Sequence, residues 1–288
     1  MTVEIVVQAA VSGILMGFVY ALIAAGLSLI FGLMEIVNFA HGEFLMLAMY
    51  VAFFAWALGG LDPLLALPLS TLGLAALGWA TYHGVIRRVL RGPMLAQIFA
   101  TFGLAVFLRS AAQFLWGADF RVVTDPLLGG RISLGGVFIG RPQLAASLAA
   151  LLAFGALTLF LARSETGLAL QATAQDRQAA ALMGIDTERM FALGWAIGGG
   201  CVGVAGGLLA MFFYVFPEVG GTFALLAYVT VALGGFGNVP AGLLAGVIVG
   251  LAETLAGLLI EPAMKYAVVF LLYLVVVLWR PQGLFGRF

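Results

Sequence analysis

The stretch IVVQAAVSGILMGFVYALIAAGLSLIFGLM, residues 5–34, contains no charged residue and decides the class of fold. A helix needs about 20 consecutive, mostly apolar residues to cross the hydrocarbon core of a bilayer. This stretch exceeds that length, and most of the other long charge-free stretches also meet it. We therefore predict an all-α polytopic membrane protein rather than a β-barrel, whose strands would appear as short alternating segments.

Composition favours the same class of protein. Of the 288 residues, 64% are hydrophobic and 9% are charged, whereas an average soluble domain is about 25% charged. Such a chain cannot cover a soluble globule with ions, which excludes a soluble single-domain enzyme, and its hydrophobicity excludes a disordered protein. The formal net charge is zero, so the expected surroundings are membrane lipid and no nucleic-acid partner is predicted.

We predict eight or nine spans in a single transmembrane domain, residues 1–288, because the shorter apolar stretches could be re-entrant. Glycine or proline interrupts several of these segments. The predicted spans are residues 5–33, 43–61, 63–86, 94–116, 143–162, 191–214, 219–238, 241–260 and 263–279.

Arginines set the predicted orientation. They gather in the loop 87–91, in the long polar loop 163–190 and after residue 279. Nine alternating spans place these groups on one side, which an excess of arginine predicts to be cytoplasmic. The loop 117–142 then lies on the extracytoplasmic side, although it also carries arginines.

Within that outer loop, residues 131–139 contain two short β-type runs around a Gly-Gly pair. This pattern predicts a β-hairpin. The hairpin either offers a docking surface for an external partner or simply connects two spans.

A short internal repeat relates two positions that lie 200 residues apart. Asn38–Gly42 reads NFAHG and 238–242 reads NVPAG, and each interrupts a long apolar run. Broken hydrophobic segments at corresponding positions of two halves point to a transport site. The span count makes the repeats parallel, whereas an inverted pair would require one re-entrant segment. The residues predicted to line the translocation path or its gate are Asn38, His41, Glu43, Asn238, Pro240 and Glu253.

Three titratable residues, Glu35, His41 and Glu43, flank the first broken segment. A charge at the centre of a membrane helix costs about 2.5–3.5 kcal/mol on insertion scales, so such groups face a cavity, a partner or the interface. They either belong to the gate or lie at headgroup level between two helices.

A doubled G-x-x-x-G motif places Gly242, Gly246 and Gly250 on one stripe of a helix. This spacing predicts close packing against a neighbouring helix backbone. Glu253 lies three residues further along and joins the stripe, which predicts a gate or an anchor inside the bundle. The alternative is that Glu253 reaches the outer interface.

The loop 163–190 contains a predicted short helix over residues 171–185, since alanine and glutamine favour helix and Gly184 suits its end. Its apolar face could insert into a groove of another protein or lie on the membrane. A helix that lies on the membrane usually carries several basic residues, whereas Arg177 is the only basic residue between residues 164 and 188. The residues predicted to dock are Asp176, Ala179, Ala180, Leu182, Met183 and Gly184.

The sequence motifs of several chemical functions are absent from this chain. There is no G-x-x-x-x-G-K-[ST] phosphate loop, and the only two histidines, His41 and His83, form no metal-ligand spacing. We therefore expect no cofactor, no metal site and no enzymatic activity in this chain. Active transport would draw its energy from a partner subunit or an ion gradient.

Three stretches resemble the permeases of ABC importers for branched-chain amino acids. GLSLIFGLMEIVNFAHGE at 26–43 is similar to their N-terminal signature, which urea and short-amide importers share. ATAQD at 172–176 with AALMGID at 180–186 resembles their ATPase-coupling loop, and LGGFGNVPAG at 233–242 resembles their C-terminal signature.

The resemblance implies a multi-subunit importer in the bacterial inner membrane. Its expected partners are a second homologous permease, two cytoplasmic ATP-binding subunits and an extracytoplasmic solute-binding protein. The loop 176–184 would dock into an ATPase groove, and closure of the ATPases would rock the permease between outward-open and inward-open states. The resemblance does not distinguish importers of amino acids from importers of urea or amides.

Two other functions remain open at the level of sequence. The chain could be a secondary transporter that relays protons or cations through Glu35, Glu43 or Glu253. It could also be a scaffold that assembles helices through its glycine faces without moving a solute.

Overall fold

The computed structural model describes residues 3–286, and nearly all of its regular structure is helical. The longer helices are α1 (Val3–Met34), α2 (His41–Gly59), α3 (Leu67–Thr81), α5 (Met94–Trp116), α6 (Arg141–Arg163), α9 (Thr187–Leu209), α10 (Val219–Gly234), α11 (Gly242–Leu259) and α12 (Lys265–Trp279). The shorter elements are the π-helical turn η1 (Tyr82–Ile86), α4 (Arg87–Val89), α7 (Glu165–Gln175), α8 (Arg177–Leu182) and the 3-10 turn η2 (Pro262–Met264), with strands β1 (Arg131–Leu134) and β2 (Val137–Gly140).

Seven helical segments between residues 3 and 286 are long and apolar enough to cross a membrane, namely α1, α2, α5, α6, α9, α11 and η2 with α12. The all-α polytopic class is therefore confirmed. The predicted count of eight or nine spans is not confirmed, because two predicted spans are shorter helices. The helix α3 has 15 residues before its geometry changes at η1, and α10 has 16 residues.

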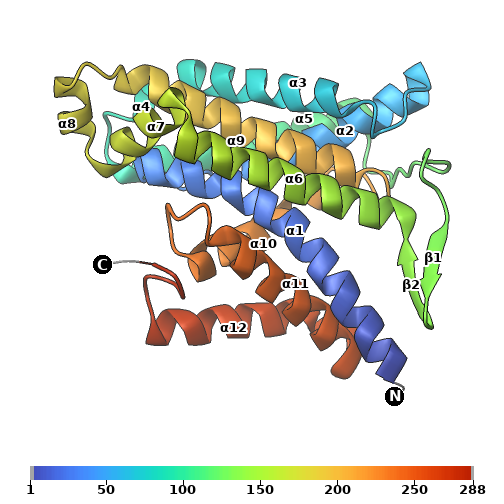
Figure 1. The fold of residues 1–288 in the computed structure, drawn as a ribbon. Coiled ribbons are helices and arrows are strands. Elements are labelled where there is room, and N and C mark those ends of the chain that lie inside the picture. The colour runs from blue at the N-terminus through green and yellow to red at the C-terminus, as the bar shows by residue number, and fades with distance from the viewer. Residues whose placement is uncertain (1–2, 287–288) are drawn as a thin grey trace.

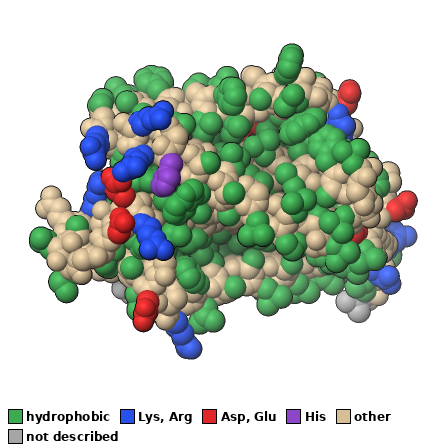
Figure 2. Space-filling model, turned by 90° about the horizontal axis from the view of Figure 1, so that it is seen from above, with side chains coloured by type: hydrophobic (Ala, Val, Ile, Leu, Met, Phe, Trp, Pro, Cys, Tyr) green, Lys and Arg blue, Asp and Glu red, His purple; other side chains and the backbone are tan. Residues whose placement is uncertain are grey.

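The long helices lie roughly side by side, and the connecting segments gather at two ends (Figure 1). We call the end with α4, α7, α8 and the C-terminus the arginine-rich end, and the end with the N-terminus and the strands the hairpin end. Glu188 joins the first two predicted arginine loops at the arginine-rich end, because its carboxylate lies 2.6 Å from Arg87 and 3.7 Å from Arg91. On the face in Figure 2, charged side chains gather toward the two ends and hydrophobic side chains lie between them.

The predicted hairpin in the loop 117–142 is confirmed. The strands β1 and β2 pair antiparallel, with Arg131 opposite Gly140 and Leu134 opposite Val137. Gly135 and Gly136 form the turn with φ values of +55° and +87°. Only glycine adopts such angles at little cost, which is why the pair ends one strand and begins the next.

Helix α1 is the central element of the bundle, and α6, α9, α10 and α11 pack around it. Its second half, from Val19 to Ile30, is almost fully buried. The glycine-rich helix α9 joins α1 to α3, since a Cβ atom on Gly198 would lie 3.1 Å from the Gly26 carbonyl oxygen and one on Gly199 would lie 2.3 Å from that of Leu74. Small residues thus let these backbones touch.

Candidate translocation site

The segment between α1 and α2 turns back into the bundle. Helix α1 ends at Met34, and Glu35 then adopts a left-handed conformation with φ +56°. His41 Nε2 donates to the Ile23 carbonyl oxygen over 2.9 Å. Ile23 lies about 16 Å before the end of α1 at 1.5 Å per residue, so α2 begins in the middle of the bundle rather than at its end.

The segment 235–241, between α10 and α11, repeats this path. Near the arginine-rich end, the ring of Phe236 lies 4.5 Å from that of Phe31, and Gly242 then begins α11 beside Ala21. In both segments an asparagine side chain caps the turn. Asn38 Oδ1 accepts from the Ala40 N–H over 3.1 Å, and Asn238 Oδ1 accepts from the Ala241 N–H over 3.3 Å.

The two broken segments therefore form a parallel repeat. Both enter from the arginine-rich end, and both are followed by a helix that runs toward the hairpin end (Figure 1). An asparagine that bonds the backbone a few residues ahead favours such a turn before a helix.

A third helix, α10, also begins in the middle of the bundle. A Cβ atom on Gly220 would lie 2.4 Å from the Gly42 carbonyl oxygen, so the first turns of α2 and α10 are in direct backbone contact. Two turns later, the Tyr228 hydroxyl donates to the Asn38 carbonyl oxygen over 2.7 Å. Hence α10 runs back toward the arginine-rich end, and two helix N-termini, which carry partial positive charge, meet inside the bundle.

Glu43 lies in the first turn of α2 and forms an ion pair that the sequence patterns did not predict. Arg109 of α5 donates from both Nε and Nη2 to Glu43 Oε1, with the Nε bond measuring 3.1 Å. The Glu43 side chain is 2% exposed, whereas that of Arg109 is 41% exposed. Within residues 3–286, Glu43 Oε2 has no hydrogen-bond partner. Arg109 is the lone charge within the predicted span 94–116, and that isolation was the signal that could have found it.

A glycine lies beside the guanidinium, and three aromatic rings pack against one another on the neighbouring elements. A Cβ atom on Gly221 would lie 3.6 Å from Arg109 Nη2, and the ring of Phe39 lies 6.3 Å from Phe102 and 5.7 Å from Tyr228. We call Phe39, Phe102, Arg109, Gly221 and Tyr228 the Arg109 patch. Its members come from α5, α10 and the first broken segment.

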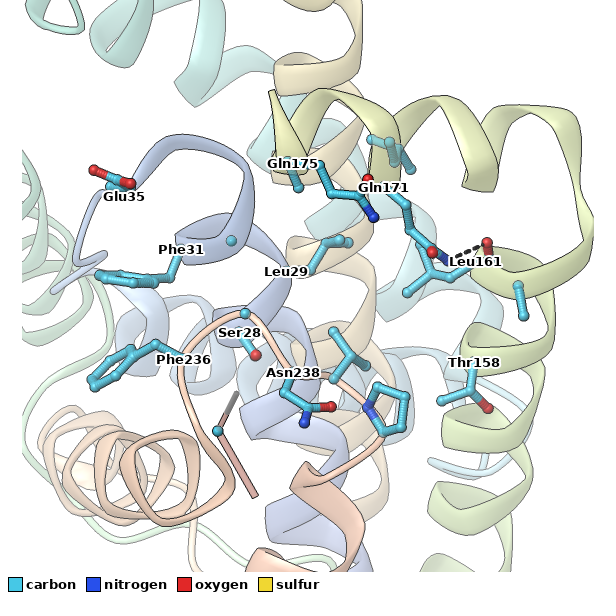
Figure 3. Close-up of a pocket in the computed structure, with 18 of the residues that line it drawn as sticks. Ser28, Leu29, Phe31, Glu35, Thr158, Leu161, Gln171, Gln175, Phe236 and Asn238 are labelled. Carbon is cyan, nitrogen blue, oxygen red and sulfur yellow. Dashed lines mark hydrogen bonds between the residues drawn. The ribbon is translucent and has the colours of Figure 1, made fainter. Parts of the chain in front are cut away.

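A cavity of about 760 Å³ lies at the arginine-rich end, between α1, α6, α7 and the second broken segment. Figure 3 shows Ser28, Gln171, Gln175 and Asn238 around it. Pro240 also lines the cavity, so two of the predicted path residues lie here rather than beside Glu43. Thus Asn38, His41 and Glu43 lie together, while Asn238 and Pro240 lie in a separate space.

Glu253 lies in neither place. Its carboxylate accepts from the Tyr20 hydroxyl over 2.5 Å and from Lys265 Nζ over 2.9 Å. It is 7% exposed and joins α11 to α1 and α12. Among the residues from 3 to 286, no group of three histidine, cysteine, aspartate or glutamate side chains is placed to hold a metal ion.

The Glu253 cluster predicts unequal effects of removing its two charges. Lys265→Met leaves a buried carboxylate without its cation, which should cost about 3–5 kcal/mol of stability. Glu253→Gln should cost less, because the Lys265 side chain is 36% exposed and can reach water. Thermal unfolding in detergent measures both, and the double variant, which leaves no unpaired charge, should recover most of the loss. Equal losses for the two single variants would contradict this reasoning.

The predicted glycine stripe faces α1. A Cβ atom on Gly250 would lie 2.2 Å from the Gly13 carbonyl oxygen, and one on Gly246 would lie 2.5 Å from that of Gly17. At Gly242 the nearest atom to such a Cβ lies 3.9 Å away, on Phe154. The tight contact therefore involves the last two glycines of the motif.

The loop 163–190 differs from the predicted single helix over 171–185. The chain is extended at Asp176, with φ −153° and ψ 106°, which separates α7 from α8. The Asp176 carboxylate accepts from the backbone N–H groups of Gln178 and Ala179 over 2.8 and 2.9 Å. An aspartate that caps a helix in this way cannot also continue the preceding one.

The tip of α8 exposes only part of the predicted docking face. Leu182 and Met183 are 88% and 83% exposed, and Ala179 and Gly184 are also exposed. Ala180 is 4% exposed, so its side chain faces the protein itself and adds little to the exposed surface of α8.

Comparisons with known proteins agree on one family. The family model described as "Branched-chain amino acid transport system / permease component" matches residues 9–277. The permease protein BraD of a high-affinity branched-chain amino acid transport system of Pseudomonas aeruginosa is 33% identical over 97% of this chain and 95% of its own length. The corresponding LivH permease of Escherichia coli is 32% identical over 96% of this chain and 94% of its own.

No solved structure matches the chain. The family match, the relatives and the seven apolar helices all indicate a multi-pass integral membrane protein. The chain belongs to the family of permease components of branched-chain amino acid transport systems.

Proposed function

We propose that the chain forms one half of the translocation path of a binding-protein-dependent ABC importer for branched-chain amino acids in the bacterial inner membrane. A second homologous permease forms the other half. Two cytoplasmic ATP-binding subunits bind α7 and α8, and the solute-binding protein docks at the hairpin end. The names of the relatives support the substrate, and the exposed tip of α8 supports the docking place.

The observation that carries the proposed path is the Arg109 side chain, which is 41% exposed. This residue lies seven positions, about 10 Å, inside the nearer end of α5. A charge on the lipid face at such a depth costs energy, so intramembrane charges face a partner or a water-filled cavity. The Arg109 patch also adjoins two helix N-termini inside the bundle, and broken helices of this kind surround transport sites. We therefore place the path on the face of α2, α5 and α10.

Asn38, His41 and Glu43 support the path from behind this face. Asn38 and His41 are fully buried, so they hold the first broken segment in place rather than meet the solute directly. Asn238 and Pro240 line the cavity at the arginine-rich end, which in this proposal is the cytoplasmic exit.

Reconstitution into liposomes tests the function. The permease with its four partner subunits should take up leucine only with ATP and the binding protein, and the chain alone should take up none. Uptake by the chain alone on an ion gradient would instead establish a secondary transporter. Assembly of the complex with no flux under any condition would leave the scaffold function.

A further inference from the structure

We infer that Arg109 binds the carboxylate of the solute during its passage, so that this permease is built for zwitterionic amino acids rather than for uncharged urea or amides. The inference rests on the proposed function, because it places a ligand contact on the proposed path. It concerns a residue that none of the motifs contains.

The geometry leaves most of the guanidinium free. A guanidinium carries five N–H donors in a planar fork. The bonds to Glu43 use Nε and Nη2, and both end on the same oxygen, Oε1. The remaining donors belong to a side chain that is 41% exposed. Such a fork matches a carboxylate with two parallel bonds, which are about twice as strong as bonds between neutral groups.

The local charge favours an anionic group. Arg109 and Glu43 cancel as a pair, and the N-termini of α2 and α10 each add a partial positive charge of about half an elementary charge. Gly42 and Gly220 bring these two N-termini into backbone contact beside Glu43. Half-helix N-termini that point at anionic groups of a substrate are a recurring device in transporters. An uncharged amide would gain much less from this field.

The Glu43 carboxylate is placed to orient Arg109 and not to bind the solute. Its free oxygen, Oε2, is buried and would lie 3.0 Å from a Cβ atom on Gly220. A solute would therefore contact the guanidinium of Arg109, whereas the Glu43 carboxylate is buried behind it. Phe102 on α5 and Leu225 on α10 are 55% and 51% exposed, so the two helices that carry Arg109 and Gly221 also present apolar surface for an aliphatic side chain.

The test separates ligand binding from charge balance. Arg109→Gln alone leaves Glu43 buried without a cation, so the informative variant is the neutral pair Glu43→Gln with Arg109→Gln. In the reconstituted complex, this double variant should assemble normally and keep ATP hydrolysis that the binding protein stimulates. Its leucine uptake per ATP hydrolysed should fall at least tenfold. Arg109→Lys, which keeps the charge but loses the fork, should lie between wild type and the double variant, and Ser110→Ala on the same helix should behave as wild type.

Two outcomes overturn the inference while the proposed function stands. Wild-type uptake by the double variant would mean that Arg109 only balances Glu43. Loss of the second permease from the double variant would mean that Arg109 pairs with that subunit. If the wild-type complex takes up no leucine at all, the proposed function fails first, and the inference fails with it.

Discussion

Replacing Gly246 by leucine is expected to prevent the permease from folding. A Cβ atom at this position would lie 2.5 Å from the Gly17 carbonyl oxygen and 2.8 Å from the Ala21 nitrogen. Both are backbone atoms of α1, which cannot move aside as a flexible side chain can. Even Gly246→Ala should cost about 1–3 kcal/mol, the usual range for forcing a methyl group into a packed core, and the rest of a leucine side chain should force α11 away from α1.

Size-exclusion chromatography of the detergent-solubilised protein measures this effect as loss of the monodisperse peak. Gly155→Leu is the matched control, because nothing lies within 4 Å of a Cβ atom at that position on α6. The control should be expressed and elute as wild type. A monodisperse Gly246→Leu protein with normal uptake would show that the glycine stripe does not hold α1 and α11 together.

Replacing Leu182 and Met183 by aspartate is expected to separate the permease from its ATPases. Both side chains project from the tip of α8, at 88% and 83% exposure, and would fill an apolar groove in the proposed complex. A buried apolar anchor at an interface contributes about 2 kcal/mol or more, and an unpaired carboxylate in its place adds a desolvation cost. Affinity should therefore fall at least about 30-fold for each change.

Co-purification and permease-stimulated ATP hydrolysis measure the docking. Gln178→Asp provides the control, since it adds the same charge at an exposed position of the same helix. Ala180→Asp is unsuitable as a test, because Ala180 is 4% exposed and the change would disturb the permease itself. Undiminished co-purification of the Leu182 and Met183 variants would exclude this helix as the docking element.

Local patterns predicted the elements that depend only on neighbouring residues. The length of the charge-free stretches predicted the membrane helices, and the Gly135-Gly136 pair predicted the hairpin. The internal repeat around Asn38 and Asn238 predicted two interrupted segments, and each asparagine side chain caps the turn of its segment. The predicted single helix over 171–185 was wrong, because alanine and glutamine content says nothing of the cap that the Asp176 carboxylate forms with the backbone N–H groups of Gln178 and Ala179.

Local sequence patterns could not predict the contact between Arg109 and Glu43. Arg109 is 66 positions from Glu43 in the chain, and no periodicity joins the two residues. Glu253 was grouped with the path residues because it is charged and lies on a glycine stripe. In the structure it contacts Tyr20, which is 233 positions away, and lies apart from Glu43.

The amino-acid sequence by itself determined that this protein is an all-helical membrane protein of the permease family, with broken segments near Asn38 and Asn238. These features follow from the length of apolar runs and from hydrogen bonds between near neighbours. Only the tertiary structure decided that α2 and α10 begin side by side, that Arg109 faces outward beside them and that Ala180 turns inward. The reason is that such proximities depend on how helices cross and how deeply each broken segment returns into the bundle, and the packing of small residues against distant backbones sets both.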